Sequence, residues 1–458
     1  MMNKKFFYIF FMALPTASTM AADPVILVED AQLPAPATQS WLPEEIDLAP
    51  VSDGGELLRN IPGISGIRQG GRGIDPIIRG QTNNRLNILL DGAYVHGGCP
   101  NRMDPPTAYT SMNSYDNIIV IKGSQSVIYG GGGSGGTLLF ERRTPRFSDD
   151  EPYRAEVSAG YKGNSDTQQY GADVAAGSRD WFIRGIVDYN DANNYEDGDG
   201  NTVRSAYTNK EGVIILGYTP SNDTRLELSY EANREEDVLF AGARMDAPYS
   251  DNDTTRLRFE SGTPVGIFAG VKAELYYSNI DHLMNNFSLR PPPANPMMKM
   301  KTPSSSDTGG GRMSGEIDAG NGMVWTLGAD YQKNNRDAER FSGAALGTLQ
   351  SIIWPDVDLQ QTGLFAEFTR PLSDRDSLKA GIRYDHVEAS AGRASEKPLL
   401  RSPEQMYVAY NGTTEADSSE DNVGGFLTLE HRLDHGTAVY ATLSRAVRTA
   451  DATERYIA

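Results

Sequence analysis

Two glycine-punctuated blocks in the first third of the chain decide the fold. The first is Ile77-Ile78-Arg79-Gly80, continuing to Asn84-Arg85-Leu86-Asn87-Ile88-Leu89-Leu90-Asp91-Gly92; the second is Ile118-Ile119-Val120-Ile121-Lys122-Gly123-Ser124-Gln125-Ser126-Val127-Ile128-Tyr129-Gly130. Between them lies the only cysteine of the 458 residues, in Gly97-Gly98-Cys99-Pro100-Asn101-Arg102-Met103. Both blocks precede a long tail with the residue pattern of β-strands.

The N-terminus carries the marks of an export signal. Lys4 and Lys5 form a basic start, residues 6–14 an apolar core, and residues 19–22 a cleavage site of small residues. We therefore predict a signal peptide over residues 1–22. Its apolar core is shorter than the about 20 residues that a membrane-spanning helix needs, and no later stretch is apolar enough to form one.

From about residue 150 onward the sequence alternates with a period of two. In residues 225–231, Leu226, Leu228 and Tyr230 alternate with charged or polar residues, and the same pattern returns at 181–189, 271–278, 364–368, 378–384 and 439–443. Such alternation is typical of membrane β-barrel strands, in which only every second residue faces lipid. It is consistent with a mean hydropathy of −0.46. The alternative, a large soluble β-sandwich, is disfavoured by the export signal and by the two glycine-punctuated blocks.

The connections between these segments are of two kinds. Short ones, such as 219–223 and 371–374, are predicted to be periplasmic turns, and long polar ones, such as 190–201 and 290–311, extracellular loops. The glycine run 130–136 lacks the Gly-Lys-Ser/Thr ending of a phosphate loop, so we interpret it as a turn before a strand at 137–142. The net charge of −19 argues against nucleic-acid binding.

In their order and position, the two blocks resemble the plug domain of TonB-dependent outer-membrane receptors. The resemblance implies an all-β transmembrane barrel, of about 22 antiparallel strands when complete, with an N-terminal mixed α/β plug domain. We divide the chain into an extended N-terminal segment (23–50), the plug (51–145) and a partial barrel (146–458). The residues after 150 supply about a dozen strands, and the chain lacks the family's terminal aromatic residue, so we expect it to be truncated.

The extended segment contains Val25-Ile26-Leu27-Val28-Glu29, which is similar to the TonB box of these receptors. A flexible strand of this kind pairs with a periplasmic partner by β-augmentation and transmits a pull. The resemblance implies that Val25, Ile26, Leu27, Val28 and Glu29 bind TonB. An ordinary disordered tail is the alternative.

The chemistry of Cys99 points to a soft metal ion. A single cysteine in an exported protein makes no intramolecular disulfide, so Cys99 is either a buried spectator or a functional thiol. Together with Met103, four residues on, it offers a thiolate and a thioether, which select Cu(I); zinc would want more imidazole, thiolate or carboxylate ligands. If the strand that begins at Val271 keeps its register, His282 and Met284 face the lumen.

Residues 97–106 resemble, more narrowly, the copper-receptor branch of the family. That resemblance implies copper bound by the plug pair Cys99 and Met103 and by two barrel methionines, Met245 and Met284. As alternatives, buried cysteine and methionine also serve as core filler. His96 and His282 are further candidate ligands for Cu(II), and Met297, Met298 and Met300 form either a second capture site or an incidental feature of a loop.

We therefore predict an outer-membrane importer of copper. No residues in the sequence indicate bond-making chemistry, so we do not expect an enzyme. Its expected partners are TonB, with its inner-membrane energising complex, outer-membrane lipid and the copper ion; the oxidation state of the copper stays open. Alternatives are a TonB-dependent receptor for an iron-siderophore or another metal chelate, and a surface copper-binding or adhesion protein without active import. An enzymatic copper protein would need imidazole-rich ligation, which five histidines without paired spacing do not offer.

Overall fold

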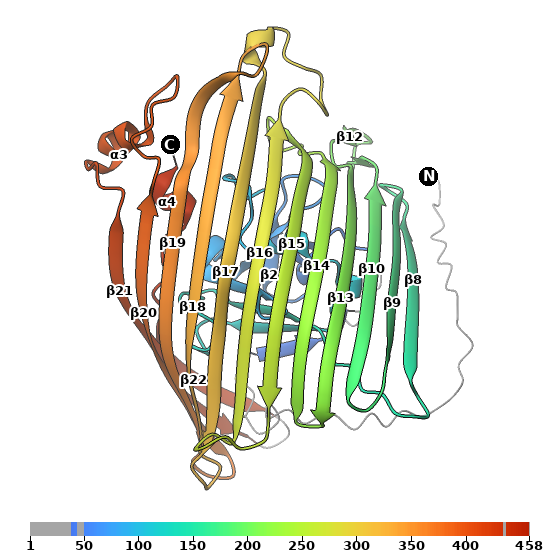
Figure 1. The fold of residues 1–458 in the computed structure, drawn as a ribbon, viewed down its shortest axis with the longest axis vertical. Helices are drawn as coiled ribbons and strands as arrows, with labels where there is room; N and C mark the ends of the chain where they lie inside the picture. Colours follow the sequence, from blue (N-terminus) through green and yellow to red (C-terminus); the bar gives the residue numbers. More distant parts are fainter. Residues whose placement is uncertain (1–37, 44–49, 434–436, 458) are drawn as a thin grey trace.

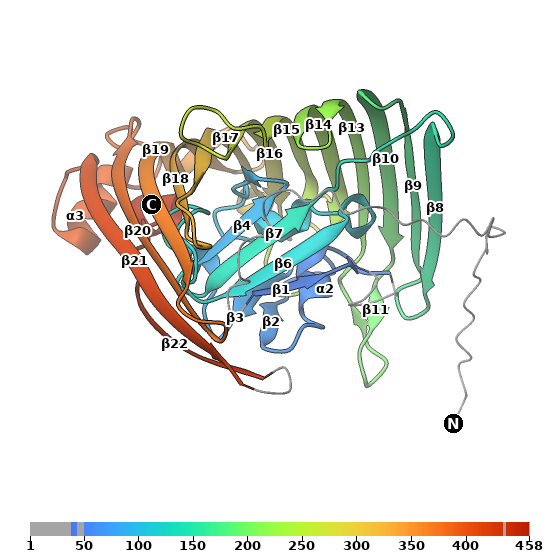
Figure 2. The ribbon, with the colours of Figure 1, turned by 90° about the horizontal axis from the view of Figure 1, so that it is seen from below.

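A curved antiparallel sheet of 13 strands forms a wall around a smaller N-terminal unit (Figures 1 and 2). The computed structural model describes residues 38–43, 50–433 and 437–457. The predicted signal peptide and the TonB-box-like segment 25–29 lie outside the described residues. In the part that is described, we find no helix with the length and apolar character to cross a membrane.

The N-terminal unit is built on a mixed five-stranded sheet in the order β1-β6-β7-β4-β5. Strands β4 and β7 are parallel and the other neighbours antiparallel. Its apolar core includes Leu57, Ile78, Leu90, Ile118 and Phe140. Its elements are β1 (Thr38–Trp41), α2 (Gly54–Leu58), β2 (Ile64–Ile67), β3 (Asp75–Ile78), η2 (Asn83–Arg85), β4 (Leu86–Leu90), β5 (Ala93–Tyr94), η3 (Pro106–Tyr109), η4 (Met112–Ser114), β6 (Asn117–Lys122) and β7 (Gly136–Glu141).

The first glycine-punctuated block forms β4 and the tight turn that follows it. Leu90 pairs with Ala93, and the two residues between them have positive φ angles, 50° at Asp91 and 85° at Gly92. An Asp-Gly pair suits this two-residue hairpin because both central positions lie in the left-handed region. The turn places the carboxylate of Asp91 at the edge of the sheet, facing the wall.

The wall follows the chain in simple up-and-down order from β8 to β22. Figure 2 shows it as an open arc around the N-terminal sheet, with β8 and β22 at its two ends. Its strands are β8 (Tyr153–Lys162), β9 (Thr167–Gly177), β10 (Trp181–Ala192), β13 (Tyr207–Ser221), β14 (Thr224–Val238), β15 (Asp246–Ser261), β16 (Gly270–Asn285), β17 (Met300–Asp318), β18 (Val324–Ser342), β19 (Thr348–Pro371), β20 (Asp376–Ala391), β21 (Ser418–Arg432) and β22 (Ala438–Arg445); β11 (Tyr195–Glu196), β12 (Thr202–Val203), η5 (Pro296–Met298), α3 (Pro403–Asn411) and α4 (Ala452–Tyr456) lie between or after them.

The predicted alternation along the wall strands is confirmed. On β14, Leu226, Leu228 and Tyr230 are exposed on the outer face, whereas Glu227, Ser229 and Glu231 are buried on the inner face. Exposed tyrosines recur on neighbouring strands, and the hydroxyls of Tyr230, Tyr277 and Tyr384 donate to Asp253, Asp307 and Asp421 at 2.5, 3.0 and 2.6 Å. Aromatic rows of this kind mark the level at which the apolar part of a membrane ends.

One predicted loop is partly wrong. Residues 290–311 were expected to form a single extracellular loop, but β17 begins at Met300 and runs for 19 residues. The upper part of this strand carries Thr302, Ser304, Ser306 and Thr308 on its buried inner face, while Ser305 and Asp307 lie on the other face. Polar residues on both faces hide the period of two, because this part of the strand carries no apolar row.

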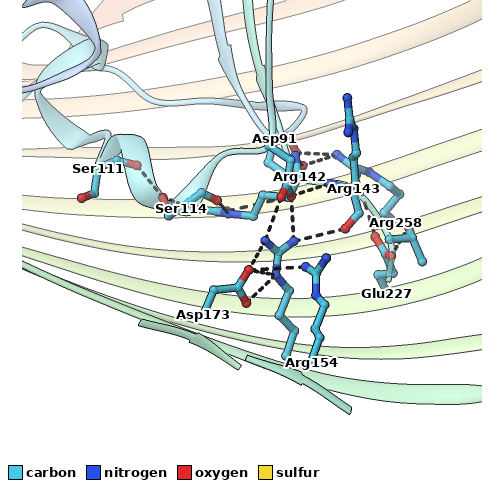
Figure 3. Close-up of polar contacts among 12 residues, drawn as sticks. Asp91, Ser111, Ser114, Arg142, Arg143, Arg154, Asp173, Glu227 and Arg258 are labelled. Carbon is cyan, nitrogen blue, oxygen red and sulfur yellow. Dashed lines mark hydrogen bonds and ion pairs between the residues drawn. The ribbon is translucent and has the colours of Figure 1, made fainter. Parts of the chain in front are cut away.

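Buried ion pairs fasten the N-terminal unit to the wall (Figure 3). Arg142, just after β7, lies 2.9 Å from Glu231 on β14 and 3.8 Å from Glu211 on β13, and its guanidinium stacks on Tyr115. Asp91 accepts from Arg258 on β15 at 2.8 Å. Burial raises the pKa of Asp91, but the guanidinium groups of Arg258 and Arg142 outweigh it and hold that pKa well below its usual range.

We predict that Leu228→Arg impairs assembly of the wall in membranes. Leu228 faces outward in the apolar stretch of β14, where an arginine costs about 2–4 kcal/mol near the membrane centre. The measurement is the fraction of folded protein in isolated outer membranes. The control is Thr208→Arg on β13. Thr208 lies two residues beyond Lys210, which pairs with the outward-facing Tyr189 of β10, so this variant should assemble normally. Equal assembly of both variants would contradict the assignment of the lipid face.

We predict that Arg142→Met loosens the N-terminal unit within the wall. Removing one partner of a buried ion pair leaves Glu231 and Glu211 uncompensated, at a cost of about 3–5 kcal/mol. The measurement is the urea midpoint for proteolytic cleavage within residues 50–142. The control is Arg179→Met, whose pair with Asp149 is exposed and should leave the midpoint unchanged. A midpoint equal to that of the wild type would show that these ion pairs contribute little.

Candidate metal centre

The structure gathers all four predicted sulfur ligands into one cluster. Cys99 and Met103 of the N-terminal unit pack with Met284 of β16 and with Met245, which lies in the loop between β14 and β15. Cys99, Met103 and Met284 are 5%, 4% and 3% exposed, and Met245 is partly buried. The sulfur side chains therefore meet at the boundary between two separate parts of the fold.

The loop that carries Cys99 and Met103 is fixed by backbone and side-chain contacts. The backbone N–H of Arg102 donates to the carbonyl of Cys99 at 2.8 Å, which closes a turn, and Arg102 itself has a positive φ of 54°. Its guanidinium forms two hydrogen bonds to Asp75 at the start of β3, at 2.8 and 3.1 Å. The turn brings the side chains of Cys99 and Met103 to the same side of the loop, where both enter the cluster.

The barrel side of the cluster comes from two connected segments. Met284 is opposite Thr302 in the β16–β17 pairing, and its burial confirms that the even-numbered residues of β16 face inward. Beside Met245, Asp246 forms ion pairs of 2.6 Å with both Arg204 and Arg290, which hold the base of its loop. The position of Met284 follows from strand parity, whereas that of Met245 depends on this loop.

Several residues of the cluster were missed by sequence reasoning. Ala192, Tyr207, Val238, Phe240 and Ala247 complete its buried wall, and Ala243 packs against it. They come from the upper ends of β10, β13, β14 and β15 and from the loop after β14, and the period of two gives no sign that they converge. They make the surroundings of the sulfurs apolar.

The two histidines named as further candidates lie in different places. His282 is 1% exposed, both its ring nitrogens are buried without a hydrogen-bond partner, and its Cβ lies 2.9 Å from where a Cβ on Gly98 would stand. His96 stacks on Tyr94 with ring centres 6.2 Å apart and lines a different cavity, with Arg336 and Asp451. His282 therefore remains a candidate ligand, and nothing places His96 with the sulfurs.

The methionines of the outer loop are also separate. Met297 and Met298 are 63% and 61% exposed on η5, and Met300 is the first residue of β17, where it pairs with Ser342. None of the three packs in the sulfur cluster. Their role as a capture site stays a prediction.

The cluster keeps its thiol protonated in the absence of a cation. Burial, with a smaller contribution from the nearby carboxylate of Asp104, raises the pKa of Cys99 to about 12. Within the described part of the chain, no group of three His, Cys, Asp or Glu side chains is arranged to hold a metal ion. A metal bound here would depend on sulfur from methionine as well as from Cys99.

A plug-like unit held by ion pairs inside a curved wall of antiparallel strands defines a plugged barrel receptor. Comparison with known proteins agrees: the family model for the TonB-dependent receptor plug domain matches residues 32–137, and that for the TonB-dependent receptor-like β-barrel matches residues 147–458. The chain belongs to the TonB-dependent receptor family. Its fold is the mixed plug and part of the barrel of that family.

Among solved structures, the chain is similar to the copper transporter OprC, with 32% sequence identity and a TM-score of 0.81 over 92% of this chain and 64% of that one. The FrpB iron transporter from Neisseria meningitidis shares the fold, with a TM-score of 0.69 and 16% identity over 92% of this chain and 68% of that one. The chain thus spans less than two thirds of the length of OprC.

Curated relatives match over shorter stretches. A probable TonB-dependent receptor, BfrD of Bordetella pertussis, is 34% identical over 137 residues, which are 29% of this chain and 17% of BfrD. The heme/hemopexin utilization protein C of Haemophilus influenzae is 29% identical over 184 residues, 39% of this chain and 25% of that protein. OprC, FrpB and the heme/hemopexin utilization protein are named for different cargoes, so family membership alone does not identify what this chain carries.

We predict that the folded protein protects Cys99 from alkylation. The pKa of about 12, against 9.0 for a free thiol, lowers the thiolate fraction at pH 8 by about a thousand-fold. Because the pKa is raised, reactivity should climb with pH over the whole range up to that value. The measurement is the rate of iodoacetamide labelling of metal-free protein in detergent, with urea-unfolded protein as control. Equal rates in the two states would contradict the buried, protonated thiol.

Proposed function

We propose that this protein imports copper across the outer membrane in a TonB-dependent manner. The observation that carries the proposal is the convergence of Cys99, Met103, Met245 and Met284 in a single buried cluster. A thiolate with thioethers is a donor set that favours Cu(I) over harder ions. The likeness to the copper transporter OprC supports the same cargo.

In this proposal, copper reaches the cluster from the extracellular side and replaces the proton of the Cys99 thiol. The apolar shell of Tyr207, Val238 and Phe240 excludes water, so the sulfurs meet little competition from it. His282 lies next to the loop with unpaired ring nitrogens and is a reserve ligand for Cu(II).

Release follows from the division of the ligands between two parts of the fold. We propose that TonB pairs with Val25–Glu29 by β-augmentation and pulls on the plug. Movement of the plug separates Cys99 and Met103 from Met245 and Met284, and the ion loses part of its donor set. The domain limits at residues 22, 50 and 145, the outer-membrane location and the lack of enzymatic activity belong to this proposal.

A receptor for a chelated metal is the second candidate, because relatives of this chain include a heme/hemopexin utilization protein and the vitamin B12 transporter BtuB of Photobacterium profundum. Those cargoes are large organic molecules, whereas the sulfur cluster is closely packed. Competition between copper and such chelates for uptake distinguishes the two candidates.

We predict about one copper ion per chain in protein purified from outer membranes, and loss of at least about ten-fold in copper affinity in Cys99→Ser and in Met284→Leu. Met284→Leu conserves volume and removes only the sulfur. The matched control is Met313→Leu on β17, where the side chain is 64% exposed on the outer face. Metal content is measured by mass spectrometry.

Uptake completes the test. Cells that express the protein should accumulate copper only when TonB is present and residues 25–29 are intact. Copper bound without TonB-dependent uptake would leave a surface copper-binding protein, and a wild-type protein without copper would sink the metal site altogether.

A further inference from the structure

Asp104, which directly follows Met103, is a buried carboxylate at the centre of the sulfur-bearing loop. It is 2% exposed. One carboxylate oxygen accepts the backbone N–H of Gly98 at 2.7 Å and the other accepts the backbone N–H of Cys99 at 2.9 Å. The carboxylate therefore fixes the backbone from which the Cys99 thiol projects.

A second chain of contacts connects Asp104 to the barrel wall. The hydroxyl of Tyr109 donates to Asp104 at 2.7 Å and lies 2.8 Å from the hydroxyl of Ser250 on β15. Because the phenol has a single proton, Ser250 is the donor in the second contact. Gly97 and Gly98 permit this close packing: a Cβ on Gly98 would stand 2.9 Å from Ile280 and His282, and one on Gly97 would stand 2.7 Å from a carboxylate oxygen of Asp104.

Among the residues that the structure describes, no lysine or arginine balances the charge of Asp104. Its hydrogen-bond donors are two backbone amides and a phenol, and across the described ranges no lysine or arginine forms an ion pair with it. The buried guanidinium of Arg72 contacts Glu235 at 2.7 Å instead. A buried carboxylate without a counter-charge favours a cation beside it.

The charge balance of metal binding shows which cation the carboxylate of Asp104 stabilises. A metal ion of charge n+ that replaces the thiol proton, with three neutral thioethers, gives Cys99–S–M with charge (n−1)+ and releases one H⁺. A monovalent ion therefore leaves the charge of the site unchanged. A divalent ion adds one positive charge, which the carboxylate of Asp104 offsets.

We infer that Asp104 is a positioning residue that also determines specificity: its carboxylate holds the Cys99 loop and allows the sulfur site to retain a divalent cation in addition to a monovalent one. The inference rests on the sulfur site proposed above. It adds a determinant outside the four sulfur ligands. The hydrogen bonds from the loop to Asp104 affect the binding of both kinds of ion alike, whereas its negative charge affects the binding of the divalent ion.

The test uses two redox-inert, thiophilic probes, Ag⁺ and Cd²⁺, with affinities measured by calorimetry at one pH on purified protein. In Asp104→Asn, which keeps the size of the side chain, Cd²⁺ affinity should fall about ten-fold or more beyond any loss for Ag⁺. Tyr109→Phe is the matched control: it removes a hydrogen bond to Asp104 without changing the charge, so any effect should be equal for the two ions.

Three results would overturn the inference. Equal losses for both ions in Asp104→Asn would leave only a structural role for the carboxylate. A Cd²⁺-selective loss in Tyr109→Phe would show that charge is not the cause, and wild-type protein that binds Ag⁺ but not Cd²⁺ would show that the site does not retain a divalent ion. Failure of the wild type to bind either ion would instead refute the proposed sulfur site.

Discussion

The structure depends on the need to pair every backbone amide and carbonyl group of a membrane-spanning segment. Lipid offers no hydrogen bonds, and each unpaired group costs several kcal/mol. In the wall, each strand from β9 to β21 pairs with a neighbour on both sides. Pairing of this kind places alternate side chains on opposite faces, so apolar rows face outward and carboxylates, guanidiniums and amides face the interior. The polar interior then determines how the plug is held.

Because the inner wall is polar and its side chains are largely buried, the plug is fastened by charge as well as by apolar packing. Arg142 among Glu231, Glu211 and Asp91 is the clearest case. The sulfur cluster is the exception, since it meets the wall through apolar and thioether groups. The plug is therefore held by ion pairs at one level of its interface with the wall and by apolar and thioether contacts at another.

Strand existence and facing could be predicted from the sequence because they follow from local alternation. The inward position of Met284 came from counting parity from Val271, and Cys99 and Met103 stood out through their chemistry. The strand that begins at Met300 was not predicted, because Ser305 and Asp307 make its outer face polar as well. The shell of Tyr207, Val238 and Phe240, and the contacts of Asp104 with Tyr109 and Ser250, join segments far apart in the chain, and no local pattern records such contacts.

The proposed ligand set, divided between plug and wall, has a thermodynamic consequence. An ion that binds only the seated arrangement stabilises that arrangement by an amount that grows with the logarithm of its concentration over its dissociation constant. A bound ion of this kind holds the plug against the wall, so tighter binding of the ion raises the work needed to move the plug. Affinity for scarce metal and ease of unloading therefore oppose each other, and the mechanical energy available for each transport cycle limits how tight the site is able to become.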